Sequence, residues 1–90
     1  MVSAQAGKAF ELRLGSGPTT GYKWEVAPPS GVRLVKEAFE RSAGAALGDG
    51  GEQVFRLLAD APGRHRLEFR LRRPWEPDPI ETRVVEVDVI

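Results

Sequence analysis

Apolar and polar residues alternate along most of the chain. Phe10, Leu12 and Leu14 alternate with charged neighbours, and the same two-residue period runs through residues 64–72 and 82–89. Successive side chains of a β-strand point to opposite faces, so this period indicates strands with one buried face. The pattern therefore predicts a half-buried β-sheet protein.

The alternation predicts six main strands and a short edge strand before them. The edge strand covers residues 2–6, and the six main strands cover residues about 9–14, 22–26, 32–39, 53–59, 64–72 and 82–89. The strand at 32–39 is irregular, because apolar residues occupy both of its phases. Helical character is confined to residues 37–47, where Gly44 and Gly48 weaken it. An all-β chain with frequent turns favours an antiparallel β-sandwich, formed here by one domain of residues 1–90.

Five connections join the main strands, and their content divides them into two groups. In a two-layer antiparallel fold successive loops alternate between the two ends. Residues 15–21, 40–52 and 73–81 should therefore lie at one end, and residues 27–31 and 60–63 at the other. The second group is ordinary proline–glycine turn chemistry. The first group holds a threonine pair, a glycine cluster and a tryptophan beside an arginine, so we predict that it forms a binding surface.

Composition narrows the possible functions. Thirteen basic and thirteen acidic residues balance in a chain of 90, which argues against a nucleic-acid or membrane surface. We expect neither of these partners and a monomeric protein. The absence of cysteine excludes disulfides and thiolate sites. No signal peptide is visible, so the protein is either cytoplasmic, or periplasmic or secreted after removal of a signal.

Residues suited to catalysis or metal binding are sparse. His65 is the only histidine, and it falls in phase with buried strand positions, which favours packing at the edge of the core. Glu76, Asp78 and Glu81 could bind a cation or perform acid–base work, but a solvated loop accounts for them better. No serine lies in a nucleophile elbow. We therefore expect no catalytic residue, no cofactor and no metal.

The glycine cluster and the two tryptophans need separate interpretations. Gly48–Gly51 lacks the lysine of a phosphate-binding loop, so it is either a hairpin tip or a backbone that approaches a partner closely. Trp24 lies in phase with Val26 and is predicted to be buried. Trp75 follows Pro74 where the alternation stops, and tryptophan is rich in interface hot spots. Trp75 is therefore predicted to be exposed, the alternative being that it folds back over the sandwich end.

Three short motifs carry a resemblance to a known family. They are GPTTGYKW at Gly17–Trp24, GDGG at Gly48–Gly51 followed by the Phe55–Leu57 strand, and RPW at Arg73–Trp75. In these motifs the chain resembles the chagasin family of cysteine protease inhibitors, which is marked by N-P-T-T-G-Y-x-W, G-x-G-G and R-P-W. The order and separation of the three make the match specific, and it extends from about Gly7 to Val89.

The resemblance implies an immunoglobulin-like β-sandwich that reversibly inhibits papain-like cysteine proteases. Its three loops would form a wedge in the protease cleft. Residues 48–51 would lie over the catalytic cysteine, and residues 19–21 would contact one side near the catalytic histidine. Arg73 and Trp75 would pack on the other side, with Pro74 stiffening the approach. The implied protease-binding residues are Pro18, Thr19, Thr20, Gly21, Gly48, Asp49, Gly50, Gly51, Arg73, Pro74 and Trp75.

The chain departs from the family pattern at Gly17, where asparagine is usual. An asparagine would brace its loop by bonding the backbone, as in an Asx turn. The family's opening strand is also expected to be short here, because the chain starts close to the first strong strand. A second functional interpretation stays open, namely an immunoglobulin-like adhesion or ligand-binding module that uses the same loops.

Overall fold

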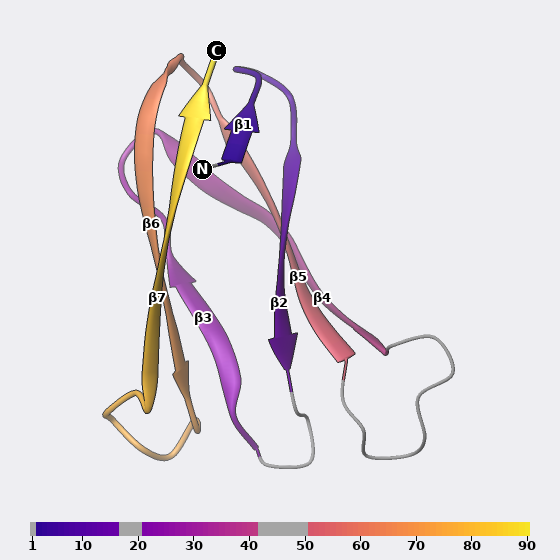
Figure 1. The fold of residues 1–90 in the computed structure, drawn as a ribbon, viewed down its shortest axis with the longest axis vertical. Helices are drawn as coiled ribbons and strands as arrows, with labels where there is room; N and C mark the ends of the chain where they lie inside the picture. Colours follow the sequence, from indigo (N-terminus) through magenta and orange to yellow (C-terminus); the bar gives the residue numbers. More distant parts are fainter. Residues whose placement is uncertain (1, 17–20, 42–50) are drawn as a thin grey trace.

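The computed structural model of the chain describes residues 2–16, 21–41 and 51–90, and these contain seven strands (Figure 1). The all-β architecture predicted from the alternation is confirmed. The strands are β1 (Val2–Ala4), β2 (Phe10–Ser16), β3 (Lys23–Ala27), β4 (Val32–Arg41), β5 (Gly51–Ala59), β6 (Gly63–Arg72) and β7 (Glu81–Val89).

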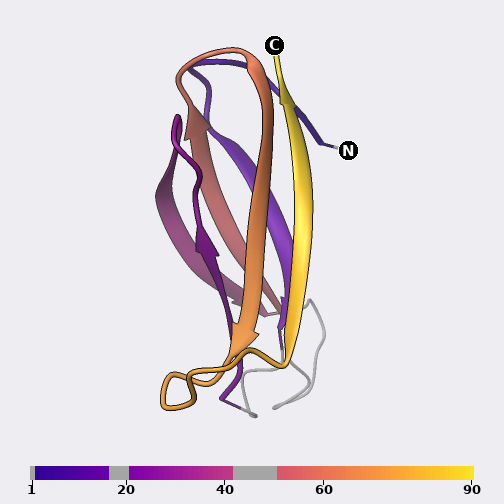
Figure 2. The same ribbon diagram turned by 90° about the vertical axis from the view of Figure 1, so that its left-hand side faces the viewer.

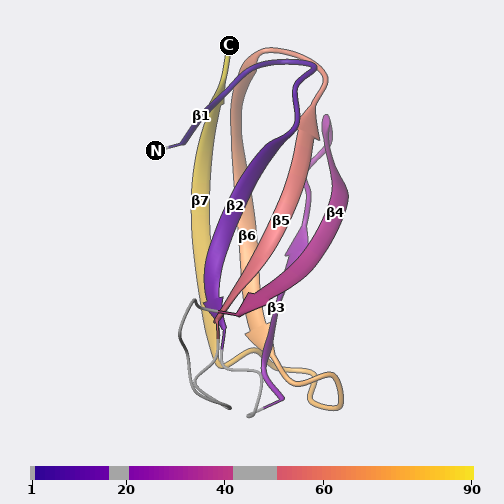
Figure 3. The same cartoon turned by 90° about the vertical axis from the view of Figure 1, so that its right-hand side faces the viewer.

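The strands form two sheets that pack face to face as a sandwich. One sheet has the order β1-β7-β6-β3 and the other has the order β2-β5-β4, and the two layers are seen from either side in Figures 2 and 3. Among the described strands all pairs are antiparallel except β1 with β7, which run parallel. The predicted edge strand thus exists, but it covers three residues and pairs in parallel with β7.

The irregular pattern in β4 has a local structural cause. The pairing register between β4 and β5 shifts between Leu34 and Lys36, which leaves Val35 as an extra residue. A bulge of this kind reverses the face on which later side chains lie. Before the shift, even-numbered residues such as the buried Val32 face the other sheet. After it, odd-numbered residues do, because Glu37 pairs with the buried Phe55. Both phases of the strand are apolar because each phase faces inward along part of its length.

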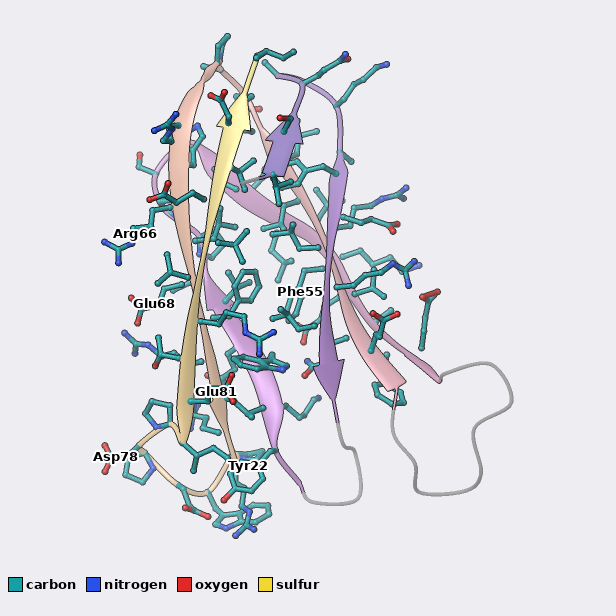
Figure 4. All side chains as sticks on the ribbon, in the orientation of Figure 1. Tyr22, Phe55, Arg66, Glu68, Asp78 and Glu81 are labelled. Atoms are coloured by element: carbon teal, nitrogen blue, oxygen red, sulfur yellow. The ribbon has the colours of Figure 1, made fainter. Side chains whose placement is uncertain are left out.

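The core lies between the sheets and is built from the predicted apolar positions. Phe55 of β5 and Phe69 of β6 are completely buried, and their rings meet edge to face with centroids 5.1 Å apart. Figure 4 shows Phe55 between the two layers. Trp24 is 2% exposed, as predicted for a core residue. His65 is half-buried and in phase with Leu67, the position expected at the edge of the core.

The strand ends that lead into the three motif-bearing loops meet at one end of the sandwich, here called the loop end. The register pairs that place them together are Ser16 with Gly51, Arg41 with Gly51, Lys23 with Arg72, and Leu71 with Glu81. The prediction from strand counting is therefore confirmed for these strand ends. Between them run residues 17–22, 42–50 and 73–80.

The opposite end carries the plain turns and the last residues of the chain. The amide of Ala6 donates to the Ile90 carbonyl at 2.8 Å, and the Ile90 amide donates to the Ala4 carbonyl at 2.9 Å. The amide of Asp60 donates to the Gly31 carbonyl at 3.3 Å, which joins the two predicted turns. Within the described residues no helix is long and apolar enough to cross a membrane.

Substitution of Phe69 by alanine tests the inter-sheet core. Loss of a completely buried ring should lower the free energy of unfolding by about 3–5 kcal/mol, measured by urea denaturation. Val84→Ala on the outer face of β7 is the control, because Val84 is 40% exposed and should change stability by less than about 0.5 kcal/mol. Equal effects of the two substitutions would contradict the assignment of the core.

Candidate functional site

Of the eleven residues predicted to contact a protease, five are described, and these five lie at the loop end. These are Gly21, Gly51, Arg73, Pro74 and Trp75. Gly51 is the first residue of β5 and is half-buried, so the glycine motif runs directly into a strand. Pro18, Thr19, Thr20, Gly48, Asp49 and Gly50 lie outside the described residues, as does Gly17.

Trp75 is both exposed and held in place. It is 70% exposed, which confirms the predicted exposure. One edge of its indole lies against Gly21, because a Cβ atom at Gly21 would be 3.0 Å from Cη2 of Trp75. Gly21 also has a φ of 79°, a conformation that favours glycine. The first and third motifs therefore touch through a contact that requires glycine.

Arg73 lies between two aromatic rings from different motifs. Its guanidinium carbon is 4.3 Å from the ring centroid of Tyr22 and 5.9 Å from that of Trp75. Both distances fall within the range of cation–π attraction. Its Nη1 donates to the Glu76 carboxylate at 3.1 Å. Arg73 is thus engaged on the molecule's own side chains, and its guanidinium links the Tyr22 and Trp75 rings of two motifs (Tyr22 is labelled in Figure 4).

Hydrogen bonds from the strands shape the segment between β6 and β7. The amide of Glu76 donates to the Arg73 carbonyl at 3.0 Å, which closes a turn around Pro74 and Trp75. Nη1 of Arg72 donates to the Glu76 carbonyl at 2.9 Å, while its Nε donates to Glu25 on β3 at 2.8 Å. Prolines at positions 74, 77 and 79 further restrict the backbone. Trp75 therefore rests on a preformed turn.

Gln53 joins the two sheets just inside the loop end. It is 3% exposed on the inner face of β5. Its Oε1 accepts from the Trp24 amide at 2.6 Å, and its Nε2 donates to the Trp24 carbonyl at 3.0 Å. The same Nε2 donates to Glu37 of β4 at 3.2 Å. One buried amide thus satisfies backbone groups at the outer edge of β3 and connects that edge to β4 and β5.

Trp24 has further polar contacts around its buried ring. Its indole Nε1 donates to the Gly15 carbonyl of β2 at 2.8 Å. The guanidinium carbon of Arg83 on β7 lies 5.1 Å from the indole centroid, and Arg83 pairs with Glu81 at 3.0 Å. Trp24 therefore contacts the strands on which the first and third loops begin or end.

A charge cluster spans the outer face of the β2-β5-β4 sheet at the base of the glycine-bearing loop. Glu40 and Glu52 stand directly opposite each other on β4 and β5, an arrangement that is unfavourable by itself. Nη1 of Arg13 on β2 bonds Glu40 and lies 3.7 Å from Glu52. The hydrogen bond and charge of Glu40 raise the pKa of Arg13, which stays cationic and offsets the repulsion.

Sequence reasoning missed three of these supporting residues. Gln53 sits at an inward strand position where an apolar residue is expected, and that break in the alternation was the available signal. In the sequence, nothing distinguishes Arg13 and Tyr22 from ordinary strand residues. The predicted solvated acidic loop is partly paired, because Glu76 and Glu81 bond arginines. Among the described residues no group of three or more His, Cys, Asp or Glu is placed to hold a metal ion.

A shallow hollow lies on the outer face of β3 and β6. Its volume is 270 Å³, and its walls are mainly charged. Figure 4 shows Arg66 and Glu68 from its wall pointing outward from β6. Ligand pockets are typically apolar, with volumes of about 300–1,000 Å³. This hollow therefore gives little support to a small-molecule site.

Comparison with known proteins matches nearly the whole chain to one family. The family profile described as "Chagasin family peptidase inhibitor I42" matches residues 3–89. Chagasin from Trypanosoma cruzi is 28% identical over 80 residues, covering 82% of this chain and 73% of chagasin. Amoebiasin-1 from Entamoeba histolytica is 28% identical over 78 residues, covering 86% of this chain and 76% of that protein.

Solved structures with the same fold accompany these relatives. The crystal structure of the cysteine protease inhibitor EhICP2 from Entamoeba histolytica superposes with a TM-score of 0.76 at 18% identity, covering 99% of this chain and 84% of that one. The solution structure of amebosin gives a TM-score of 0.73 at 26% identity, covering 99% and 87%. The predicted immunoglobulin-like sandwich is confirmed by these matches together with the two-sheet topology.

Gly21→Ala tests the contact between the first and third motifs. The new methyl group meets the Trp75 ring and the positive φ strains the backbone, so we expect a loss of about 1–2 kcal/mol in the free energy of unfolding. Gly15→Ala is the matched control, because a Cβ at Gly15 has no neighbour within 4 Å. Denaturation and the NMR signal of the Trp75 indole N–H measure the effect. An unchanged indole signal in Gly21→Ala would contradict the contact.

Proposed function

Because this chain belongs to the chagasin family of peptidase inhibitors, we propose that it blocks the active-site cleft of papain-like cysteine proteases with its loop end. As a member of that family it is a reversible cysteine protease inhibitor and not an enzyme.

The observation that carries the proposal is the exposed but braced indole of Trp75. An aromatic side chain with 70% exposure offers a large apolar area to a partner. Gly21 and Arg73 already hold it in one place, which reduces the conformational entropy lost on binding. Exposed aromatic anchors on rigid supports are typical of binding hot spots. Trp75 is therefore the proposed principal anchor.

The three loops have different proposed roles. Gly48, Asp49, Gly50 and Gly51 cover the catalytic cysteine, since a chain with little side-chain bulk can enter a narrow groove. Residues 18–21 contact one wall of the cleft. Pro74 and Trp75 contact the other wall. Arg73 acts with them by holding Trp75, because its guanidinium lies 5.9 Å from the Trp75 ring centroid and is itself fixed by Tyr22 and Glu76.

Inhibition by occlusion needs no reacting group on the inhibitor. The blocker has only to fill the cleft and resist displacement, and preformed strand ends limit the ordering cost of docking. One loop end per molecule would occupy one cleft, so we propose that a monomer acts with one-to-one stoichiometry. An adhesion or ligand-binding module using the same loops is not favoured, because the family match spans residues 3–89.

Titration of papain and cathepsin L with the folded protein tests this function. Activity should fall linearly until one inhibitor is present per active site and should return after dilution, as expected for reversible binding. A folded protein that leaves both enzymes active at micromolar concentration would overturn the assignment to papain-like targets.

Trp75→Ala tests the proposed anchor. We expect the inhibition constant to rise by about tenfold or more, as for an interface hot spot. The free energy of unfolding should change by less than about 1 kcal/mol, because most of the ring is exposed. Ile90→Ala is the control, since Ile90 is also 70% exposed but lies at the opposite end. An equal inhibition constant for the two variants would remove Trp75 from the interface.

A further inference from the structure

We infer that Gln53 is a positioning residue, which sets the spacing of the three loops and so determines how well they fit a protease cleft. The inference rests on the proposed function, and it concerns a side chain outside all three sequence motifs. Gln53 lies two residues after the glycine motif, in the central strand of its sheet, and is 3% exposed.

The amide of Gln53 acts as a strand partner for Trp24. In an antiparallel ladder, two opposed residues exchange N–H···O bonds in both directions. Gln53 reproduces this exchange with one side chain, accepting at 2.6 Å and donating at 3.0 Å. Because β3 is an edge strand, the outward backbone groups of Trp24 have no neighbouring strand in their own sheet. Gln53 supplies that partner from the facing sheet.

The strands that flank the three loops are all connected to the Gln53–Trp24 pair. Gln53 and Glu37 lie on β5 and β4, which flank the second loop, and Glu37 accepts the remaining amide hydrogen at 3.2 Å. Trp24 lies on β3 and its indole bonds Gly15 of β2, which together flank the first loop. Leu71 of β6 pairs with Trp24 in the sheet, and Arg83 of β7 lies over its ring, so the third loop is connected too.

Directional bonds determine geometry in a way that apolar packing does not. Hydrophobic contact between sheets is non-directional, whereas a hydrogen bond fixes both distance and angle. Binding constellations generally need to be held within about 0.5 Å by the surrounding shell. The Gln53–Trp24 pair lies between the loops and the apolar core, so it fixes the offset between the sheets where the loops begin.

Gln53→Met is the direct test. Methionine has a similar length and apolar character suited to a buried site, but it lacks the two hydrogen bonds to Trp24. The control is Val87→Ala, a fully buried core substitution in the part of β7 that pairs with β1, away from the loop end. Inhibition is measured at a temperature at which both variants are folded.

We expect the inhibition constant to rise by about tenfold or more for Gln53→Met, and by less than about twofold for Val87→Ala, because misplacement of loops weakens a preorganised interface. A purely structural role predicts no change for either variant while both are folded. An inhibition constant for Gln53→Met that equals that of the wild type or of Val87→Ala would overturn the inference.

Hydrogen exchange at the Trp24 amide provides a readout that needs no protease. In the wild type this amide should exchange slowly. In Gln53→Met its exchange should accelerate by about tenfold or more relative to the Leu57 amide, because β3 can then open locally without unfolding of the core. In Val87→Ala the two amides should accelerate together. Rapid exchange of the Trp24 amide in the wild type would overturn the role of Gln53, whereas failure of the wild type to inhibit would overturn the proposed function.

Glu37→Ala is the second variant, for the case in which Gln53→Met does not fold. Glu37 is exposed at the sandwich edge, so its loss leaves the core intact and removes only the acceptor that orients the amide. We expect a smaller rise in the inhibition constant, by about threefold, with faster exchange at Trp24. Unchanged values of both quantities would overturn the inference.

Discussion

The pairing of one side-chain amide with the backbone of an edge strand is the interaction on which the loop end depends. A two-sheet sandwich can bury its apolar faces in several relative offsets, because apolar contact has no direction. The bonds between Gln53 and Trp24 select one offset. They also satisfy peptide groups at the edge of β3 that would otherwise be buried without a partner in their own sheet, which is costly. This relative offset of the sheets determines where the strand ends that lead into the three loops lie.

The loop end combines an exposed surface with a fixed conformation. Trp75 stands out from the molecule, yet Gly21, Arg73 and the turn closed by Glu76 hold its ring and backbone. The charged residues nearby mainly neutralise one another, as Arg73 does with Glu76 and Arg83 with Glu81. In the part of the loop end that the structure describes, the exposed Trp75 indole therefore lies beside ion pairs rather than beside uncompensated charges.

The architecture follows from the alternation of residues such as Leu67 and Phe69, because inward strand positions must be apolar to build a core. That the strand ends leading into the three loops meet at one end follows from the strand order alone. The supporting contacts were beyond sequence reasoning, because they join residues that are distant along the chain. The mixed apolar phases around Val35 and the polar residue at the inward position of Gln53 mark these sites in the sequence, but the β4–β5 register shift and the bonds between Gln53 and Trp24 depend on pairing between distant residues. The contact residues themselves were named through motif resemblance rather than derived.

The chain's last residues lie at the end opposite the loops, where Ile90 and Ala4 share a backbone hydrogen bond. The longest dimension of the molecule is 40 Å, so the loop end and this terminal β1–β7 pair are separated by most of its length (Figure 1). A protease bound at the loop end would consequently leave the β1–β7 pair and the turns beside it in contact with solvent. The two ends of the sandwich are thus free to change independently, one under the demands of binding and the other under those of folding.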